Sequence, residues 1–259
     1  MTKKYERMYR LAAIRMQLVL PDSPLRRILI LEPSGSGKST VGKRIGRILG
    51  IPTIHLDIHY WNPNWVETPK DEWPGKVKKL IASETWVMDG NYTSTLKMRA
   101  DAADTLIFLD MTRRASYFRI FVRFLRNRGR TRNDVAEGCP EKIDLDFVKW
   151  IWNYPRTRKP VIFRFFEKMK LNKNVYILRN QKEVEKFLAD QTDQVIATSI
   201  MNAVDRSYAV NVEDLDVKVK DGIVTLSGKL PTHAACEAAL ECAYNTYGVR
   251  DVKDRLHIE

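Results

Sequence analysis

The stretch Ser34-Gly35-Ser36-Gly37-Lys38-Ser39-Thr40 decides the fold of this chain. It follows an apolar run, Ile28–Leu31, that predicts a strand, and it precedes a helical pattern over Val41–Leu49. Strand, glycine-rich loop and helix form the setting of a phosphate-binding P-loop. The glycines let backbone N–H groups crowd around a phosphate, and the start of the helix adds its positive dipole end. We therefore predict that residues 34–40 bind the phosphates of ATP.

Individual residues of this loop have expected roles. Lys38 is expected to reach the β and γ phosphates, and the Ser39 hydroxyl to ligate Mg²⁺. The alternative is an ordinary Gly/Ser turn that caps a helix. One position departs from the motif, because Glu32 stands where the pattern has glycine. Its carboxylate is expected to repel phosphates unless the side chain turns away, so a catalytically dead loop is a further alternative.

Charge is spread unevenly along the chain. The 259 residues are 44% hydrophobic, which is enough for a core, and carry a net charge of +12. Residues 1–190 hold 37 Lys/Arg and 21 Asp/Glu, whereas residues 191–259 hold 7 and 11. This asymmetry predicts two units with different partners. The basic unit is suited to phosphorylated substrates, nucleic acid or anionic lipid.

The cysteines and the N-terminal residues bear on localisation. Three scattered cysteines are too few for a disulfide framework or a zinc site and fit reduced thiols. No apolar run approaches membrane-spanning length, and we predict a cytoplasmic protein. Residues 1–24 form an extension in which residues 3–20 resemble a basic, partly amphipathic helix. We expect this helix to pack on the domain, with peripheral membrane or partner binding as the alternative.

From Arg26 to Asp190 short apolar strands alternate with helices, which predicts parallel βαβ units with helices on both faces of a sheet. This α/β domain is assigned to residues 25–190. The expected strands are Arg27–Leu31, Thr53–Leu56, Thr85–Met88, Thr105–Leu109 and Asn174–Leu178. The expected helices are Lys38–Leu49, Asp71–Ile81, Thr93–Asp101, Arg113–Arg126, Asp144–Met169, with a break near Pro155 and Pro160, and Gln181–Asp190.

Residues 191–259 follow a different pattern. An Asp221-Gly222 turn between two alternating runs, Leu215–Lys220 and Ile223–Ser227, is a strong hairpin signal. With helices over Gln194–Asp205 and Thr232–Asn245 and a last strand over Asp251–Ile258, the segment predicts a small α+β domain of order α-β-β-α-β. It holds no obvious catalytic constellation.

Three acids follow strands of the predicted sheet, where ligands of such folds collect. Asp57 is expected to orient or deprotonate an acceptor hydroxyl. Asp89 and Asp110 are expected to support Mg²⁺ together with Ser39. Gly90 and Asn91, which follow Asp89, are expected to contact the acceptor. The alternative for each acid is a carboxylate that caps a turn or helix.

An arginine series uninterrupted by acid runs from Arg113 to Arg132. Its later part, with Arg128, Arg130 and Arg132, predicts a lid whose guanidinium groups stabilise a transferring phosphoryl group. Two further arginines, at positions 156 and 158, are expected to return toward the acceptor. The alternatives are a solvated basic face, or a stripe that follows the phosphates of nucleic acid.

Residues 27–190 resemble the bacterial DNA topology modulation proteins (FlaR-like), which are adenylate-kinase-like P-loop proteins. The matching segments are SGSGKST (34–40), HLDIHYW (55–61), DGNY (89–92), RNRGRTRNDVAEGCPEK (126–142) and DFVKWIWNY (146–154). The resemblance implies a five-stranded parallel sheet with a lid, ATP and Mg²⁺ as cofactors, and kinase chemistry on a nucleotide or small-molecule acceptor.

Residues 193–259 resemble a BON domain. The resemblance rests on Val217-x-Val219-x-Asp221-Gly222-x-Val224-x-Leu226-Ser227-Gly228 and on Tyr247-Gly248-Val249-x-x-Val252. It implies phospholipid or protein binding without catalysis. The sequence therefore predicts an ATP-dependent phosphotransferase with a C-terminal interaction domain, the protein partner being bound through residues 191–259. The alternatives are an ATP-binding regulator associated with nucleic acid, and a membrane- or partner-binding adaptor with a degenerate P-loop.

Overall fold

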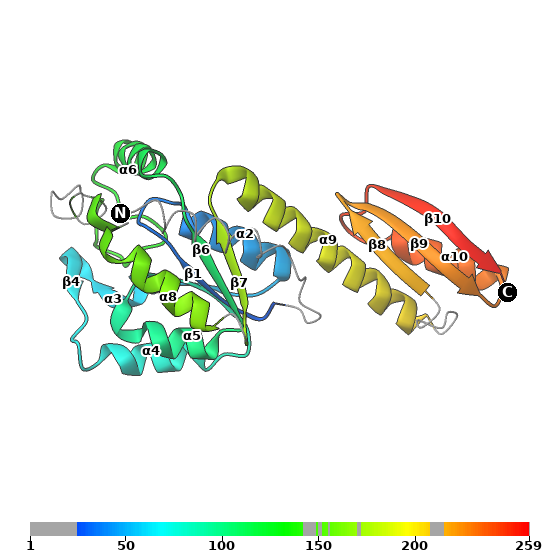
Figure 1. Cartoon of the computed structure of the whole chain (residues 1–259), viewed down its shortest axis with the longest axis horizontal. Helices are drawn as coiled ribbons and strands as arrows, with labels where there is room; N and C mark the ends of the chain where they lie inside the picture. The colour runs from blue at the N-terminus through cyan, green and yellow to red at the C-terminus, as the bar shows by residue number, and fades with distance from the viewer. Residues whose placement is uncertain are drawn as a thin grey trace. The chain divides into compact units, whose positions relative to one another are not determined.

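The computed structural model describes residues 25–141, 149, 152–154, 156–169, 172–207 and 215–258. The extension over residues 1–24, with its predicted helix at 3–20, lies outside the described residues. The chain divides into two compact units between Val184 and Glu185 (Figure 1). The domain limits expected from the sequence, at 24/25 and 190/191, stay predictions.

The first unit is built on a five-stranded parallel sheet, as predicted. Its strand order is β2-β5-β1-β6-β7. The P-loop strand β1 is central, and both it and β6 are almost wholly buried along their length, as expected for strands covered on both faces. The strands are β1 (Arg27–Leu31), β2 (Thr53–His55), β5 (Trp86–Asp89), β6 (Thr105–Leu109) and β7 (Asn174–Leu178).

Helices cover both faces of this sheet (Figure 1). Helices α4 (Trp73–Ile81), α5 (Leu96–Ala102) and α8 (Lys159–Met169) pack on one face, in a core that also contains Leu29, Trp86 and Phe108. Helix α2 (Lys38–Leu49) packs on the opposite face, where a Cβ at Gly42 would lie 3.5 Å from Ile30. Helix α6 (Arg113–Asn127) follows β6.

The segment between β2 and α4 contains elements that the sequence patterns did not predict. A short helix α3 (Leu56–Tyr60) leads into a hairpin of β3 (Trp61–Asn62) and β4 (Val66–Glu67) around the 3-10 turn η1 (Pro63–Trp65). Another 3-10 turn, η2 (Thr93–Thr95), forms the start of the helix predicted over Thr93–Asp101. Such elements are too short to produce a periodic pattern.

One helix prediction needs correction, and the predicted break near Pro160 is present in the structure. The helices expected over Gln181–Asp190 and Gln194–Asp205 form one continuous helix, α9 (Gln181–Arg206). The intervening residues include neither glycine nor proline, so nothing interrupts the backbone hydrogen bonds. The helix predicted over Asp144–Met169 is described only in part, and within that part a turn at Arg158 separates α8 from the preceding helical residues. Helix α8 begins at Lys159, so Pro160 lies in its first turn, where proline needs no hydrogen-bonded N–H.

The second unit has the α-β-β-α-β order expected from its sequence. Strand β9 (Ile223–Leu230) pairs antiparallel with β8 (Leu215–Lys220) and parallel with β10 (Asp251–Ile258). Helix α10 (His233–Tyr244) connects β9 to β10, and its Ala235, Ala239 and Ala243 are buried in the core of this unit. The unit buries Ile200 and Val204 of α9 in the same core.

Candidate active site

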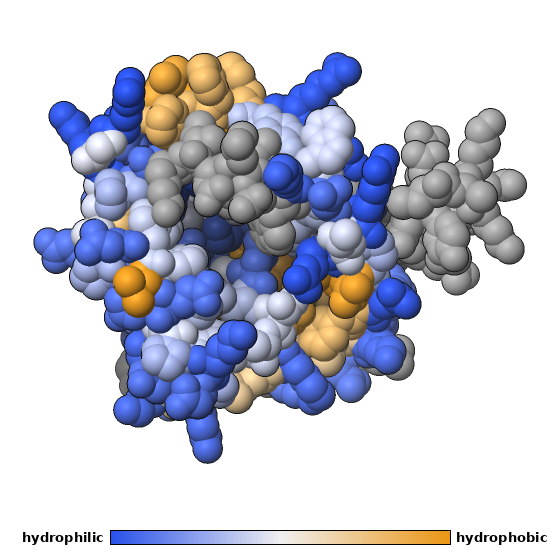
Figure 2. All heavy atoms as spheres, turned by 90° about the vertical axis from the view of Figure 1, so that its left-hand side faces the viewer, coloured by the Kyte–Doolittle hydropathy of each residue, from blue (hydrophilic) through white to orange (hydrophobic). Residues whose placement is uncertain are grey.

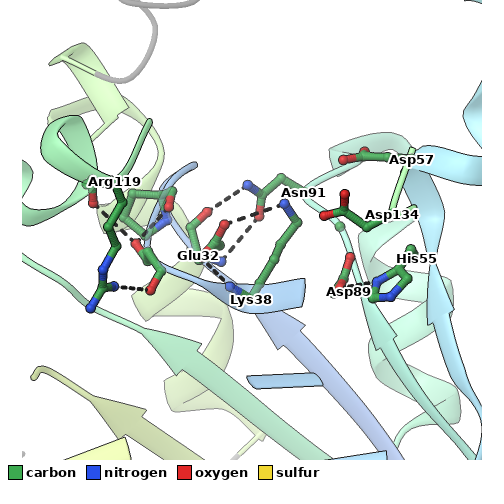
Figure 3. Close-up of polar contacts among 12 residues, drawn as sticks. Glu32, Lys38, His55, Asp57, Asp89, Asn91, Arg119 and Asp134 are labelled. Carbon is green, nitrogen blue, oxygen red and sulfur yellow. Dashed lines mark hydrogen bonds and ion pairs between the residues drawn. The ribbon is translucent and has the colours of Figure 1, made fainter. Parts of the chain in front are cut away.

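The P-loop leaves the carboxyl end of β1 and wraps around the start of α2. Gly35 and Gly37 adopt φ of 88° and 106°, and Gly37 caps α2. Ser36 is buried, and its hydroxyl donates to the backbone oxygen of Pro33 at 2.7 Å. Arg119 of α6 donates to the backbone oxygen of Ser36 at 2.6 Å (Figure 3). One hydrogen bond within the loop and one from α6 therefore hold the loop in this conformation.

Glu32 does not turn away from the P-loop. One carboxylate oxygen accepts the backbone N–H of Lys38 at 2.9 Å, and the other lies 3.4 Å from the Lys38 ammonium (Figure 3). Asn91 fixes the Glu32 backbone, because its amide donates to the Glu32 backbone oxygen at 2.6 Å. The side chain of Glu32 is only 2% exposed. An internal carboxylate thus occupies two P-loop donors that the motif assigns to phosphate.

Lys38 is surrounded by acids from several elements. Burial alone would lower its pKa, but the charges of Glu32, Asp57, Asp89 and Asp134 outweigh burial and raise it above the usual value. For Glu32 burial dominates, and the pKa of this carboxyl is raised despite the opposing charge of Lys38. The structure therefore brings Asp57 and Asp89, both predicted from the sequence, into the electrostatic neighbourhood of the P-loop lysine (Figure 3).

Two of these acids have specific partners. Asp89, at the end of β5, lies with Oδ2 at 2.6 Å from Nδ1 of His55, at the end of the adjacent strand β2. Both side chains are buried. Asp57, on α3, accepts a hydrogen bond of 2.6 Å from the Tyr92 hydroxyl. The two carboxylates are thus held in place, but with different neighbours.

A buried arginine holds the loop after β5. Arg99 of α5 is 0% exposed and donates to the backbone oxygens of Gly90 at 2.9 Å and Tyr92 at 2.6 Å. Burial lowers the pKa of Arg99 to about 10, although electrostatic interactions with Tyr92 and Asp89 act to raise it. Arg99 fixes the loop that presents Asn91 to Glu32. Sequence reasoning missed this role, since a lone arginine on a short helix carries no motif.

Residues 128–141 form a closed loop after α6, which we call the lid loop. Bridges join Arg128 to Glu141 and Thr131 to Pro140 at its base. Its buried side chains, among them Cys139, pack against Trp61 and Trp65 of the β3–β4 segment. Further contacts are the bond from Trp65 Nε1 to the Pro140 oxygen, at 3.0 Å, and that from the Asn64 N–H to the Gly138 oxygen, at 2.9 Å.

Asp134 brings the lid loop to the P-loop. Burial disfavours its charge, but Arg132, a hydrogen bond from Ser39 and the charge of Lys38 together lower its pKa. Arg132 itself is ion-paired, at 3.3 Å with Asp134 and at 2.7 Å with Glu141. No motif marks Asp134 in the sequence, although it lies in the segment 126–142 that carries the family resemblance.

The remaining predicted residues lie apart from these contacts or are engaged elsewhere. Asp110, after β6, pairs with Lys159 of α8 at 2.7 Å. Thr40, Arg128, Arg130, Arg156 and Arg158 are exposed, and Ser34 is half-buried. The metal role of Asp110, the phosphoryl-stabilising role of Arg128 and Arg130, and the acceptor role of Arg156 and Arg158 stay predictions.

Figure 2 shows the side of the molecule on which Figure 1 draws α3 and β4, and this side has a recess with hydrophilic atoms inside it. Apolar side chains gather above it in this view, where Figure 1 places α6. Three large side chains on α6, Phe118, Phe121 and Leu125, are more than half exposed. Among the described residues, no cluster of three or more His, Cys, Asp or Glu side chains is arranged to hold a metal ion by itself.

Comparisons with known proteins recognise the two units unequally. Residues 192–259 match the BON domain family, which confirms that resemblance. No curated protein matches the chain. None of the described helices has the length and apolarity needed to span a membrane.

Solved structures similar to this chain include three small-molecule kinases. Shikimate kinase from Acinetobacter baumannii, in complex with shikimate, is 14% identical with a TM-score of 0.43, over 67% of this chain and 94% of that chain. Shikimate kinase from Bacteroides thetaiotaomicron is 16% identical with a TM-score of 0.41, over 66% and 98%. A gluconokinase from Sinorhizobium meliloti 1021 is 16% identical with a TM-score of 0.37, over 67% and 97%. Similarity at this level does not identify an acceptor.

Proposed function

We propose that the protein is a Mg²⁺-ATP-dependent phosphotransferase of the nucleotide or small-molecule kinase type, with its BON domain as an interaction module. The observation that carries this proposal is the convergence of Asp57, Asp89 and the lid residue Asp134 around Lys38 at the carboxyl edge of the parallel sheet. Ligands of open α/β sheets bind at this edge. Phosphoryl transfer needs such positioned charges more than it needs covalent chemistry from the protein.

The residues present fit a nucleotide triphosphate in all but one respect. Positive φ at Gly35 and Gly37 opens the backbone toward the phosphate position, and the helix start of α2 lies behind it. Lys38 and Ser39 are the phosphate and metal ligands that the motif requires, and bound Mg²⁺-ATP would supply the transferable phosphoryl group. The exception is Glu32, whose carboxylate occupies donors of the same cradle.

Acceptor handling falls to residues on the opposite side of Lys38. Asp57 is the candidate for orienting or deprotonating an acceptor hydroxyl, because a partly buried carboxylate on a strand-end helix can accept that proton. Tyr92 holds the carboxylate from one side at 2.6 Å. Asp89, fixed by His55, supports the metal or its water shell. The lid loop excludes water when it covers these groups.

The decisive experiment measures ADP formation from Mg²⁺-ATP in the presence of nucleosides, nucleotides and small alcohols, with Lys38→Ala as the comparison. We expect at least one acceptor to stimulate turnover, and Lys38→Ala to abolish it while the fold is retained. Undiminished turnover by Lys38→Ala would contradict the phosphate assignment. Failure of every acceptor would favour the second candidate below.

The second candidate is a binding-only adaptor whose P-loop has lost catalysis. The specific observation in its favour is that Glu32 already neutralises Lys38. In this case the BON domain carries the function, and nucleotide binding, if retained, acts as a switch. The acidic balance of residues 191–259 favours a protein partner over anionic lipid, which attracts clustered Lys and Arg.

A further inference from the structure

The contact between Glu32 and Lys38 has the geometry of a bound ligand. In a P-loop, the backbone N–H of the lysine and its ammonium both bind phosphate oxygens. Here one oxygen of the Glu32 carboxylate accepts that N–H at 2.9 Å, and the other lies 3.4 Å from the ammonium. The carboxylate therefore presents two oxygens to the same two donors that a phosphate would use.

Neighbouring contacts fix Glu32 in this position. The Asn91 side chain accepts a hydrogen bond from the Glu32 backbone N–H at 3.3 Å and donates one to the Glu32 backbone oxygen at 2.6 Å. Arg99 holds the backbone on both sides of Asn91 through Gly90 and Tyr92. With its backbone clamped, the Glu32 side chain can leave Lys38 only by rotating about its own bonds.

We propose that the Glu32 carboxylate is a built-in competitor of the nucleotide phosphate for the Lys38 cradle. Mg²⁺-nucleotide then binds with full affinity only when this carboxylate is displaced or neutralised. The inference rests on the proposed function, since it concerns the same phosphate site. It makes Glu32 a residue that sets nucleotide affinity.

The competition has two electrostatic parts. A phosphate placed beside an ionised Glu32 adds a negative charge next to a buried one, and like charges a few ångströms apart repel strongly in such a site. Lys38 must also exchange one partner for another. Removing the charge of Glu32 is therefore expected to tighten nucleotide binding by about 10- to 100-fold, which converts to about 1.4–2.8 kcal/mol.

The competition also predicts a dependence on pH. Glu32 faces Lys38 from α2, Asp89 from β5 and Tyr154 from the segment before α8. Burial raises its pKa above the ordinary value, with Lys38 opposing and Asp89 adding to the rise. Because the nucleotide is bound more tightly by the neutral form, binding takes up protons. Affinity is therefore expected to rise as pH falls toward this pKa.

The test is isothermal titration calorimetry of the full chain with Mg²⁺-ADP, which has no γ-phosphoryl group to transfer. The variants are Glu32→Gln, Glu32→Gly, which restores the glycine of the motif, and Lys38→Ala. Glu84→Gln is the matched control, because it removes the same charge from an exposed side chain before β5, at the amino end of the sheet. Titrations in two buffers of different ionisation enthalpy measure the protons taken up.

We expect Glu32→Gln and Glu32→Gly to bind Mg²⁺-ADP about 10- to 100-fold more tightly than the wild type, and Glu84→Gln to match the wild type. Proton uptake on binding is expected to be smaller in Glu32→Gln than in the wild type at the same pH, because the nucleotide's own titration is common to both.

The failures are distinguishable. If both Glu32 variants keep their fold and bind no more tightly than the wild type while Lys38→Ala loses binding, the competition is refuted and the nucleotide site stands. If Lys38→Ala binds as well as the wild type, the phosphate site itself is wrong, and with it the competition. If no protein binds, including Glu32→Gly, both the competition and the nucleotide site are refuted.

Discussion

Gly35 gives the sharpest test of how the P-loop is packed. Its φ is +88°, and a Cβ built there would lie 2.7 Å from two side-chain atoms of Ile120 and 2.8 Å from the backbone oxygen of Ser116. Gly50, at the end of α2, also has a positive φ, +67°, but a Cβ there would meet nothing within 4 Å. Gly35→Ala and Gly50→Ala therefore share the backbone strain and differ in the clash with α6.

The two costs can be separated. Left-handed backbone costs a non-glycine residue about 1–2 kcal/mol, and this applies to both variants. Overpacking a filled site adds about 1–3 kcal/mol, and this applies to Gly35→Ala alone. We expect Gly50→Ala to lose about 1–2 kcal/mol of unfolding free energy and Gly35→Ala about 2–5 kcal/mol. Because one clashing atom belongs to the α6 backbone, Gly35→Ala/Ile120→Ala should not recover the wild-type stability.

Tryptophan fluorescence in urea measures this difference in the first unit alone, because all six tryptophans precede Val184. Gly35→Ala should also bind Mg²⁺-ADP more weakly, because α6 contacts the P-loop through the hydrogen bond from Arg119 to the Ser36 backbone oxygen. Equal destabilisation by the two alanines would refute the packing of α6 against the P-loop.

Two further predictions concern Asp57 and the second unit. Tyr92→Phe removes the 2.6 Å hydrogen bond to Asp57. We expect kcat/KM for the acceptor to fall, while the affinity for Mg²⁺-ADP, measured by calorimetry, stays unchanged. A loss of nucleotide affinity alone would contradict this division of roles. Asp193→Ala removes two carboxylate contacts to the β8–β9 turn, at 2.7 Å to the Asp221 N–H and 2.9 Å to the Gly222 N–H. We expect the unfolding free energy of the second unit to fall by about 1–3 kcal/mol. Circular dichroism measures it once the transition of the first unit, detected by tryptophan fluorescence, is subtracted. Asp190→Ala on the same helix is the control and should not destabilise the second unit. An equal loss in both would mean that the helix, and not the turn contact, carries the effect.

The sheet could be predicted from the sequence because its strands are short apolar runs between periodic helices. Arg27–Leu31, Thr105–Leu109 and Asn174–Leu178 have the predicted limits. The β3–β4 hairpin could not be predicted from the sequence, because contacts with the lid loop stabilise it and no local pattern marks it. The continuity of α9 was missed for a related reason. The change of pattern at Asp190 reflects a change of neighbours, and it does not break the helix.

The candidate site was predictable where a residue type follows a strand. Asp57 and Asp89 were found in this way, and both contribute to the charge around Lys38. Asp134 and Arg99 were not, because their roles depend on a loop that folds back and on a buried side chain that binds backbone oxygens. Asp110 was also predicted from its position after a strand, but its carboxylate pairs with Lys159 of α8, a contact that the sequence pattern does not reveal.

Glu32 shows what a departure from a motif can and cannot reveal. The sequence places a carboxylate beside a phosphate site, and from charge alone the expected result is repulsion. Repulsion, however, requires a second anion, and the Glu32 carboxylate is ion-paired with the lysine that the motif supplies. With Lys38 as its partner the carboxylate is an attractive ligand, and burial inside the loop makes that pairing hard to replace by water. Replacing Glu32 leaves the buried Lys38 ammonium without this partner, which costs stability even where the intact pair adds little. Nucleotide affinity is therefore expected to rise, and the stability of the loop to fall, when Glu32 is replaced.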